Sequence, residues 1–227
     1  MTSPKPNSRI TRMAVSAVLL AVLPALGTTA PAGNFPPIGP LPEKEAPSPN
    51  LVKMGQRLFF DVRVSGDGAI SCATCHDPRQ GFTRQTDKKG QPMALSDAYP
   101  GTRHFRNAPT LLNVAYKEDF ADTGWGWDGH MGANLNDVVR DQITETMMMN
   151  TDMRLMHERM KQDPVYVQMC QENFNGESSS GRGRKALDAF MRTLTSSNPP
   201  FDTGMLSGEA QLGRILFEGK AGCIACH

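Results

Sequence analysis

Two stretches of the chain carry the same arrangement of reactive residues, in which two cysteines separated by two residues are followed at once by a histidine. The first is CATCH and the second is CIACH, and their residues are Cys72, Cys75 and His76, and Cys223, Cys226 and His227. Closely spaced cysteines serve three kinds of chemistry: a redox disulfide, a zinc site, or the covalent attachment of a c-type haem. The histidine after each pair separates these alternatives.

A covalent haem uses every residue of the motif. The two thiols add across the two vinyl groups of the porphyrin, and a short helical turn presents both sulfurs along one edge of the ring. The histidine can then reach the iron as an axial ligand. A single zinc ion would have to join two motifs about 150 residues apart and leave two histidines unused. A thioredoxin-like disulfide does not need the histidine. The motifs therefore predict two covalent haems with His76 and His227 as iron ligands, and zinc or a disulfide as the weaker alternatives.

The segments before the two motifs repeat as well. GQRLFF (55–60) precedes the first motif and GRILFE (213–218) precedes the second. Each is typical of the end of an amphipathic helix, because apolar residues recur at helical spacing. These residues are Leu51, Met54, Leu58 and Phe59 in the first copy, and Leu212, Leu216 and Phe217 in the second. A helix end followed by a haem motif, found twice, predicts an internal repeat of two cytochrome-c-like units.

The remaining pattern is also helical. Apolar spacing predicts helices over 134–145 and 184–195, whereas 61–71, 77–110 and 176–183 are rich in loop-forming residues. The methionine-rich run 147–160 is expected to pack in a core rather than to ligate iron. Cys170, on a helix opened by Asp163 and Pro164, is expected to be a buried small hydrophobic residue. No long strand-like alternation appears, so the predicted fold class is all-α, two cytochrome-c-like domains with long loops.

The first 32 residues are typical of a secretory signal peptide. Three basic residues (Lys5, Arg9 and Arg12) precede an apolar run over 13–27, and Ala30-Pro31-Ala32 offers a small-residue cleavage site. An uncleaved membrane anchor is the alternative. Residues 33–50 contain six prolines and predict an extended tether. We therefore expect a periplasmic protein.

The charge balance excludes one class of partner. Removing the three basic residues of the leader leaves 21 Lys and Arg against 23 Asp and Glu. Such a chain has no basic field to attract nucleic acid.

From about residue 50 to its end, the chain resembles the bacterial di-haem cytochrome c peroxidases and their MauG-type relatives. The matching segments are 55–82, RNAPTLLNVAY (106–116), WDG (127–129), FMRTLTSSNPPFD (190–202) and 206–227. The resemblance implies two mostly helical domains with one covalent haem each. It assigns 51–200 to a peroxide-reactive domain and 201–227 to the start of an electron-transfer domain. Because the family continues beyond its second haem motif, the sequence is expected to be a truncated fragment.

The resemblance also implies a function. It predicts an exported enzyme that reduces hydrogen peroxide to water with electrons from a small soluble donor, a cytochrome c or a cupredoxin, and that forms a homodimer. A MauG-type oxidase acting on a partner protein is the second hypothesis. A di-haem electron carrier with no chemistry of its own is the third.

The same resemblance assigns candidates around the first haem. Trp127 matches the tryptophan that lies between the two haems in the family; a buried aromatic anchor is the alternative. His130 stands where the family usually has arginine. The family's catalytic glutamate follows a glutamine by ten residues, which from Gln142 leads to Asp152. Glu145 is the competing carboxylate. For both carboxylates the alternative is a solvated helix terminus.

Two further residues are carried over from the family. A loop histidine caps the first haem in many members, and here either Tyr99 or His104 lies near the expected spacing. If neither binds, the haem stays open, as in the MauG-type enzymes; an exposed loop residue is the alternative for His104. Asn107 matches a calcium ligand, where a hard cation takes oxygen ligands.

Overall fold

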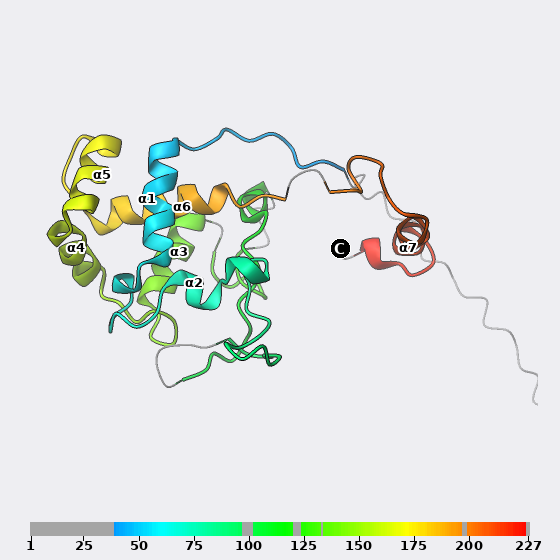
Figure 1. The fold of residues 1–227 in the computed structure, drawn as a ribbon, viewed down its shortest axis with the longest axis horizontal. Helices are drawn as coiled ribbons and strands as arrows, with labels where there is room; N and C mark the ends of the chain where they lie inside the picture. The colour runs from blue at the N-terminus through cyan, green and yellow to red at the C-terminus, as the bar shows by residue number, and fades with distance from the viewer. Residues whose placement is uncertain (1–38, 97–101, 120–123, 133, 197–198, 226–227) are drawn as a thin grey trace, which may run out of the picture. The chain divides into compact units, whose positions relative to one another are not determined.

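The computed structural model of the chain describes residues 39–96, 102–119, 124–132, 134–196 and 199–225. Within these ranges the only β pairings are two isolated bridges, Asp77 with Thr83 and Thr86 with Pro92. The all-α prediction is confirmed (Figure 1). The α-helices of the described ranges are α1 (Pro49–Phe60), α2 (Cys72–Cys75), α3 (Leu135–Thr144), α4 (Met153–Gln162), α5 (Pro164–Phe174), α6 (Ser180–Arg192) and α7 (Gly208–Glu218); 3₁₀ helices cover Val62–Val64, Pro78–Gln80, Val114–Asp119 and Cys223–Ala225.

The chain divides into two compact units. One spans Gly39–Met205 and holds α1 to α6, and the described part of the other spans 206–225 and holds α7. The predicted signal peptide, 1–32, and the first part of the predicted tether lie outside the described residues. No helix of the described ranges is both long and apolar enough to cross a membrane.

Helix α1 carries the apolar face that the sequence predicts. Pro49 lies at its first turn, where the missing N–H costs no hydrogen bond, and the helix includes the last two residues of the expected tether. Met54, Leu58 and Phe59 are almost completely buried. This face therefore forms one side of the core.

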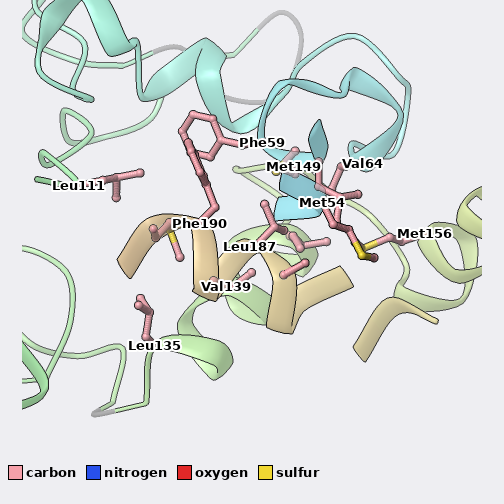
Figure 2. Close-up of a cluster of buried hydrophobic side chains, with 14 of the residues drawn as sticks. Met54, Phe59, Val64, Leu111, Leu135, Val139, Met149, Met156, Leu187 and Phe190 are labelled. Carbon is pink, nitrogen blue, oxygen red and sulfur yellow. The ribbon is translucent and has the colours of Figure 1, made fainter. Parts of the chain in front are cut away.

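The other side of the core is α6, which approaches α1 very closely (Figure 1). A Cβ atom built on Gly55 would lie 1.8 Å from the carbonyl oxygen of Ala186, so only glycine fits there. One turn further along each helix, the rings of Phe59 and Phe190 meet with centroids 5.2 Å apart (Figure 2). The glycine of the repeated motif thus has a packing function.

The methionine-rich segment packs into the same core, as predicted (Figure 2). Met149, Met156 and Met160 are each less than one-tenth exposed. A Cβ atom on Gly183 would lie 2.9 Å from Met156 and from Met160, so this glycine lets α4 approach α6. The predicted loop 176–183 is therefore wrong over its last four residues, which belong to α6, and Gly183 serves helix packing there. The buried position predicted for Cys170 is confirmed.

Charged side chains tie the start of α5 to the end of α1. Asp163 caps α5 by accepting a hydrogen bond from the Val165 N–H at 2.8 Å, and it accepts another from Arg63 at 2.7 Å. Arg63 also donates to Asp61, which accepts from the Tyr166 hydroxyl at 2.7 Å. Burial raises the pKa of Asp163, but the hydrogen bonds from Arg63 and Val165 outweigh burial and leave this pKa below its ordinary value. The ionised carboxylate therefore stabilises the fold.

Helix α7 differs from its repeat partner α1 in its surroundings. Its residues Leu212, Ile215 and Leu216 are more than half exposed. A Cβ atom built on Gly213, the counterpart of Gly55, would meet no atom of the described residues within 4 Å. The two copies of the motif therefore form the same helix without the same packing.

The two repeat glycines provide a matched test of this packing. Because a methyl group at position 55 collides with the α6 backbone, we expect Gly55→Ala to lower the free energy of unfolding by about 3 kcal/mol or more. Gly213→Ala adds the same methyl group in open space and should not destabilise the protein, since alanine favours a helix by about 1 kcal/mol. Urea titrations followed by circular dichroism measure both. Equal stabilities would contradict the close approach.

Replacing Asp163 with asparagine keeps an N-cap acceptor but removes the charge. Because the folded-state pKa is lowered, the stabilisation is complete above the unfolded-state value of about 4 and is lost as the pH falls through the folded value. We expect Asp163→Asn to cost about 2 kcal/mol at neutral pH. Urea titrations at several pH values should also show that the unfolding free energy of this variant falls less in acid than that of the native chain. The exposed Asp137 gives the control, and Asp137→Asn should change stability by less than about 0.5 kcal/mol. An unchanged acid slope in Asp163→Asn would disprove the role.

Candidate functional site

The first cysteine pair lies on a single helical turn, as predicted. Helix α2 runs Cys72–Cys75, the Ser71 N–H donates to the Thr74 hydroxyl at 3.0 Å, and the His76 N–H donates to the Cys72 carbonyl at 2.9 Å. Neither cysteine of this turn is part of a disulfide. The turn thus presents two thiols and an imidazole in the order that haem attachment requires.

The ring of His76 is oriented by the backbone of the following loop. Its Nδ1 lies 3.0 Å from the Phe82 carbonyl oxygen. Since a carbonyl only accepts, Nδ1 carries the proton in this hydrogen bond, and Nε2 is the nitrogen with the lone pair. A hydrogen bond of this kind fixes the tautomer and orientation of a metal-binding histidine.

Phe82 reaches this position in a strained conformation. Its φ is 56° and that of Gly81 is 68°, both in the left-handed region. Glycine adopts this region freely, but for a bulky residue it is an outlier that costs about 1–3 kcal/mol. The turn is closed by the Phe82 N–H, which donates to the Asp77 carbonyl at 2.9 Å. Such strain typically accumulates where a site needs one exact geometry.

The loop is fastened to the RNAPT segment, 106–110. The hydroxyl of Thr83 donates to the Ala108 carbonyl, and the hydroxyl of Thr110 donates to the Gly81 carbonyl. The indole N–H of Trp127 donates to the Asn107 carbonyl at 2.7 Å. Two of the motifs that carried the resemblance therefore lie together beside the attachment turn.

The electrostatics of the turn favour neutral groups. Burial lowers the pKa of His76 and outweighs the opposing effect of the Phe82 and Pro109 carbonyls, which favours the neutral imidazole that binds metals. Burial, with a further contribution from Cys75, raises the pKa of the Cys72 thiol to about 12. Within the described ranges, no three His, Cys, Asp or Glu side chains gather as a metal ion would require. The order of two thiols and an imidazole on one helical turn fits a c-type haem.

The segment between α3 and α4 lies against the first thiol. The Met149 sulfur is 4.0 Å from the Cys72 sulfur. The Met149 carbonyl accepts from the Gly66 N–H at 2.8 Å, and the Thr151 hydroxyl donates to the Val64 carbonyl at 2.6 Å. These contacts hold the segment beside the attachment turn.

The predicted carboxylates flank this segment. Glu145 is the C-cap of α3 and Asp152 is the N-cap of α4, and both are exposed. Hydrogen bonds from Arg154 lower the pKa of Asp152 to about 2. Gln142 is half-buried, with its amide 3.5 Å from the Met131 sulfur. The helix-terminus alternative describes the positions of both carboxylates, and their catalytic roles stay predictions.

The other predicted residues lie in a group at the surface. Trp127 is 64% exposed, so the alternative that it is a buried aromatic anchor is wrong. The buried tryptophan is Trp125. His104 stacks on Phe105 with ring centroids 4.2 Å apart. His130 pairs with Asp128, which also pairs with Arg106 at 2.8 Å.

The two roles carried over to this group stay predictions. The Asn107 side-chain oxygen accepts a hydrogen bond from Ser96 at 2.6 Å, and its calcium role is a prediction, as is the haem-capping role of His104. Tyr99 lies outside the described residues.

The second motif is described only in part. Cys223 is an exposed free thiol in the 3₁₀ helix Cys223–Ala225, whereas Cys226 and His227 lie outside the described residues. The second haem site therefore stays a prediction.

Sequence reasoning missed two contributors to the first site. No propensity predicts a left-handed phenylalanine, although the glycine before Phe82 signals a turn. The contact of Met149 with Cys72 joins residues far apart in the chain, and one sequence gives no signal for it.

A matched pair of glycines tests whether the turn at Gly81 orients His76. Gly81 and Gly90 both have positive φ and both have room for a methyl group. Alanine at either position should cost about 1–2 kcal/mol in unfolding free energy, because it strains the backbone. We expect only Gly81→Ala to change the electron paramagnetic resonance spectrum of the ferric haem, since only it moves the Phe82 carbonyl. Identical spectra in both variants would show that the turn does not orient the ligand.

Comparison with known proteins agrees with this geometry. Cytochrome-c peroxidase IdrP2 of Pseudomonas sp. (strain SCT) is 38% identical over 228 residues, which cover 97% of this chain and 59% of the relative. Methylamine utilization protein MauG of Methylorubrum extorquens is 36% identical over 200 residues, which cover 83% of this chain and 52% of the relative. The chain thus spans a little over half the length of these relatives.

Solved structures share the fold. A MauG-like protein associated with microbial copper homeostasis matches with a TM-score of 0.65 and 21% identity, over 82% of this chain and 53% of that one. The di-haem peroxidase BthA from Burkholderia thailandensis matches with a TM-score of 0.65 and 22% identity, over 80% of this chain and 49% of that one. The model of one family, described as di-haem cytochrome c peroxidase, matches residues 49–211. The chain therefore belongs to the di-haem cytochrome c peroxidase family, whose members carry covalently bound haems.

Proposed function

We propose that the chain is an exported, periplasmic di-haem peroxidase that reduces hydrogen peroxide to water. Its electrons come from a small soluble donor, a cytochrome c or a cupredoxin. The first haem is attached to Cys72 and Cys75 with His76 as its ligand, and the second to Cys223 and Cys226 with His227.

One observation carries the proposal. The turn at α2 presents two thiols that form no disulfide and a histidine whose Nδ1 donates to the Phe82 carbonyl. This arrangement leaves Nε2 for iron and serves no purpose in a disulfide enzyme. Membership in the peroxidase family supports the same conclusion.

A bound haem supplies the iron chemistry of peroxide reduction. Proton transfer is left to the protein, and a carboxylate is suited to it. The two candidates, Glu145 and Asp152, flank the segment that touches Cys72 through Met149. Asp152 is held by Arg154 in an ion pair and has a pKa of about 2, which makes it a weak proton acceptor. We therefore assign the proton transfer to Glu145.

A MauG-type oxidase that acts on a partner protein is the second candidate. It is supported by the 36% identity to MauG over 83% of this chain. The two candidates differ in whether reduced cytochrome c sustains turnover.

Substitution of the carboxylates tests the proposal in the haem-loaded chain, with peroxide and reduced cytochrome c as substrates. We expect Glu145→Gln to slow turnover by about a hundredfold or more, because proton transfer is lost. Asp152→Asn keeps the helix cap and should stay within about threefold of the native rate. Glu158→Gln, at an exposed position on α4, is the matched control and should leave the rate unchanged.

Three results would overturn parts of the proposal. Equal rates for Glu145→Gln and the control would remove the assigned role of Glu145. A chain that reacts with peroxide but does not turn over reduced cytochrome c would favour the MauG-type alternative. A ferrous chain that binds no small ligand would indicate an electron carrier, in which both axial positions are filled.

A further inference from the structure

Arg84 is a buried cation at the haem-attachment turn. Its side chain is almost completely covered, with 7% of the residue exposed. Its guanidinium donates a hydrogen bond to the Thr74 carbonyl oxygen at 2.9 Å. Thr74 lies between the two cysteines of α2, so the positive charge is held against the turn that carries both thiols.

The loop after the motif brings Arg84 to this position. The chain turns back at Gly81 and Phe82, and the Asp77 N–H then donates to the Thr83 carbonyl at 3.1 Å. The next residue, Arg84, therefore returns to the end of α2. The last carbonyls of a helix have no partner within it, and arginine side chains commonly satisfy them.

We propose that Arg84 sets the reduction potential of the first haem, because its side chain holds a permanent positive charge beside the attachment turn. The proposal rests on the proposed function, because it requires a haem on Cys72 and Cys75. It goes beyond that function by assigning an electrostatic role to a residue outside the attachment motif and outside the proposed proton path.

The sign of the effect follows from the charge of the haem. Ferric haem carries one more positive charge than ferrous haem, so a nearby cation destabilises the ferric form and raises the reduction potential. Arginine carries a permanent positive charge in proteins. Burial reduces screening by solvent and salt, so a cation here acts more strongly than one on the surface.

The neighbouring charges do not reverse this sign. The buried carboxylate of Asp77, beside His76, is paired with Arg79 at 2.9 Å. Removing the charge of Arg84 makes the electrostatic potential at the haem more negative, whatever other groups surround the side chain. The predicted direction of the change is therefore independent of the other partners of Arg84.

The test is a spectroelectrochemical titration of the full chain carrying Cys223→Ser and Cys226→Ser, which leaves one haem site. Arg84→Met keeps much of the apolar stem and removes the charge, whereas Arg84→Lys keeps a positive charge. Lys88→Met removes an exposed cation from the same loop and is the matched control. At the native midpoint potential, we expect Arg84→Met to lower the ratio of ferrous to ferric haem roughly tenfold. Arg84→Lys should stay near the native ratio, and Lys88→Met should leave it unchanged.

The contrary outcomes are distinct. An unchanged ratio in a haem-loaded Arg84→Met chain overturns the inference and leaves the proposed function intact. If Arg84→Met fails to retain haem, Arg84→Gln provides the same comparison. If both neutral variants lose haem while Arg84→Lys retains it, Arg84 is a folding residue, which also overturns the inference. A parent chain without covalent haem contradicts the proposed function itself.

Discussion

The contact between the backbones of α1 and α6 at Gly55 and Ala186 is the constraint on which the rest of the first unit depends. It brings the rings of Phe59 and Phe190 together and sets the direction in which α1 ends. The chain passes from this end through the 3₁₀ helix Val62–Val64 to the attachment turn at α2. The position of the two thiols therefore depends on the close packing of α1 against α6, which involves residues that precede the motif in the chain.

Hydrogen bonds hold the attachment turn and orient its histidine. The carbonyl of Phe82 orients His76, and this carbonyl is available because Gly81 and Phe82 adopt left-handed conformations. The hydroxyls of Thr83 and Thr110 fix the same loop to the RNAPT segment. Strain at one residue is thus offset by bonds to a distant segment. This explains why two motifs far apart in the sequence act on one site.

The sequence predicted what depends on local periodicity and chemistry. The face of α1, the extents of α3 and most of α6, the core role of the methionines and the burial of Cys170 were all predictable, because apolar residues at helical spacing favour packing against another element. The same spacing in α7 does not lead to burial, since Leu212, Ile215 and Leu216 are more than half exposed. The glycines were misleading. Gly183 was interpreted as a loop residue, although it gives Met156 and Met160 room against α6. The conformation of Phe82 and the exposure of Trp127 depend on tertiary contacts, which one sequence does not reveal.

The central claim is that Cys72 and Cys75 carry a covalent haem whose iron is bound by His76. The most direct test of this attachment begins with periplasmic expression of the chain with a c-type maturation system. The chain is then digested, and the peptide that contains both cysteines is analysed by mass spectrometry. We expect this peptide to carry the mass of haem, and a pyridine haemochrome spectrum to give about two haems per chain. A peptide without haem, with its cysteines joined in a disulfide or bound to zinc, would show that the first motif is not a haem site.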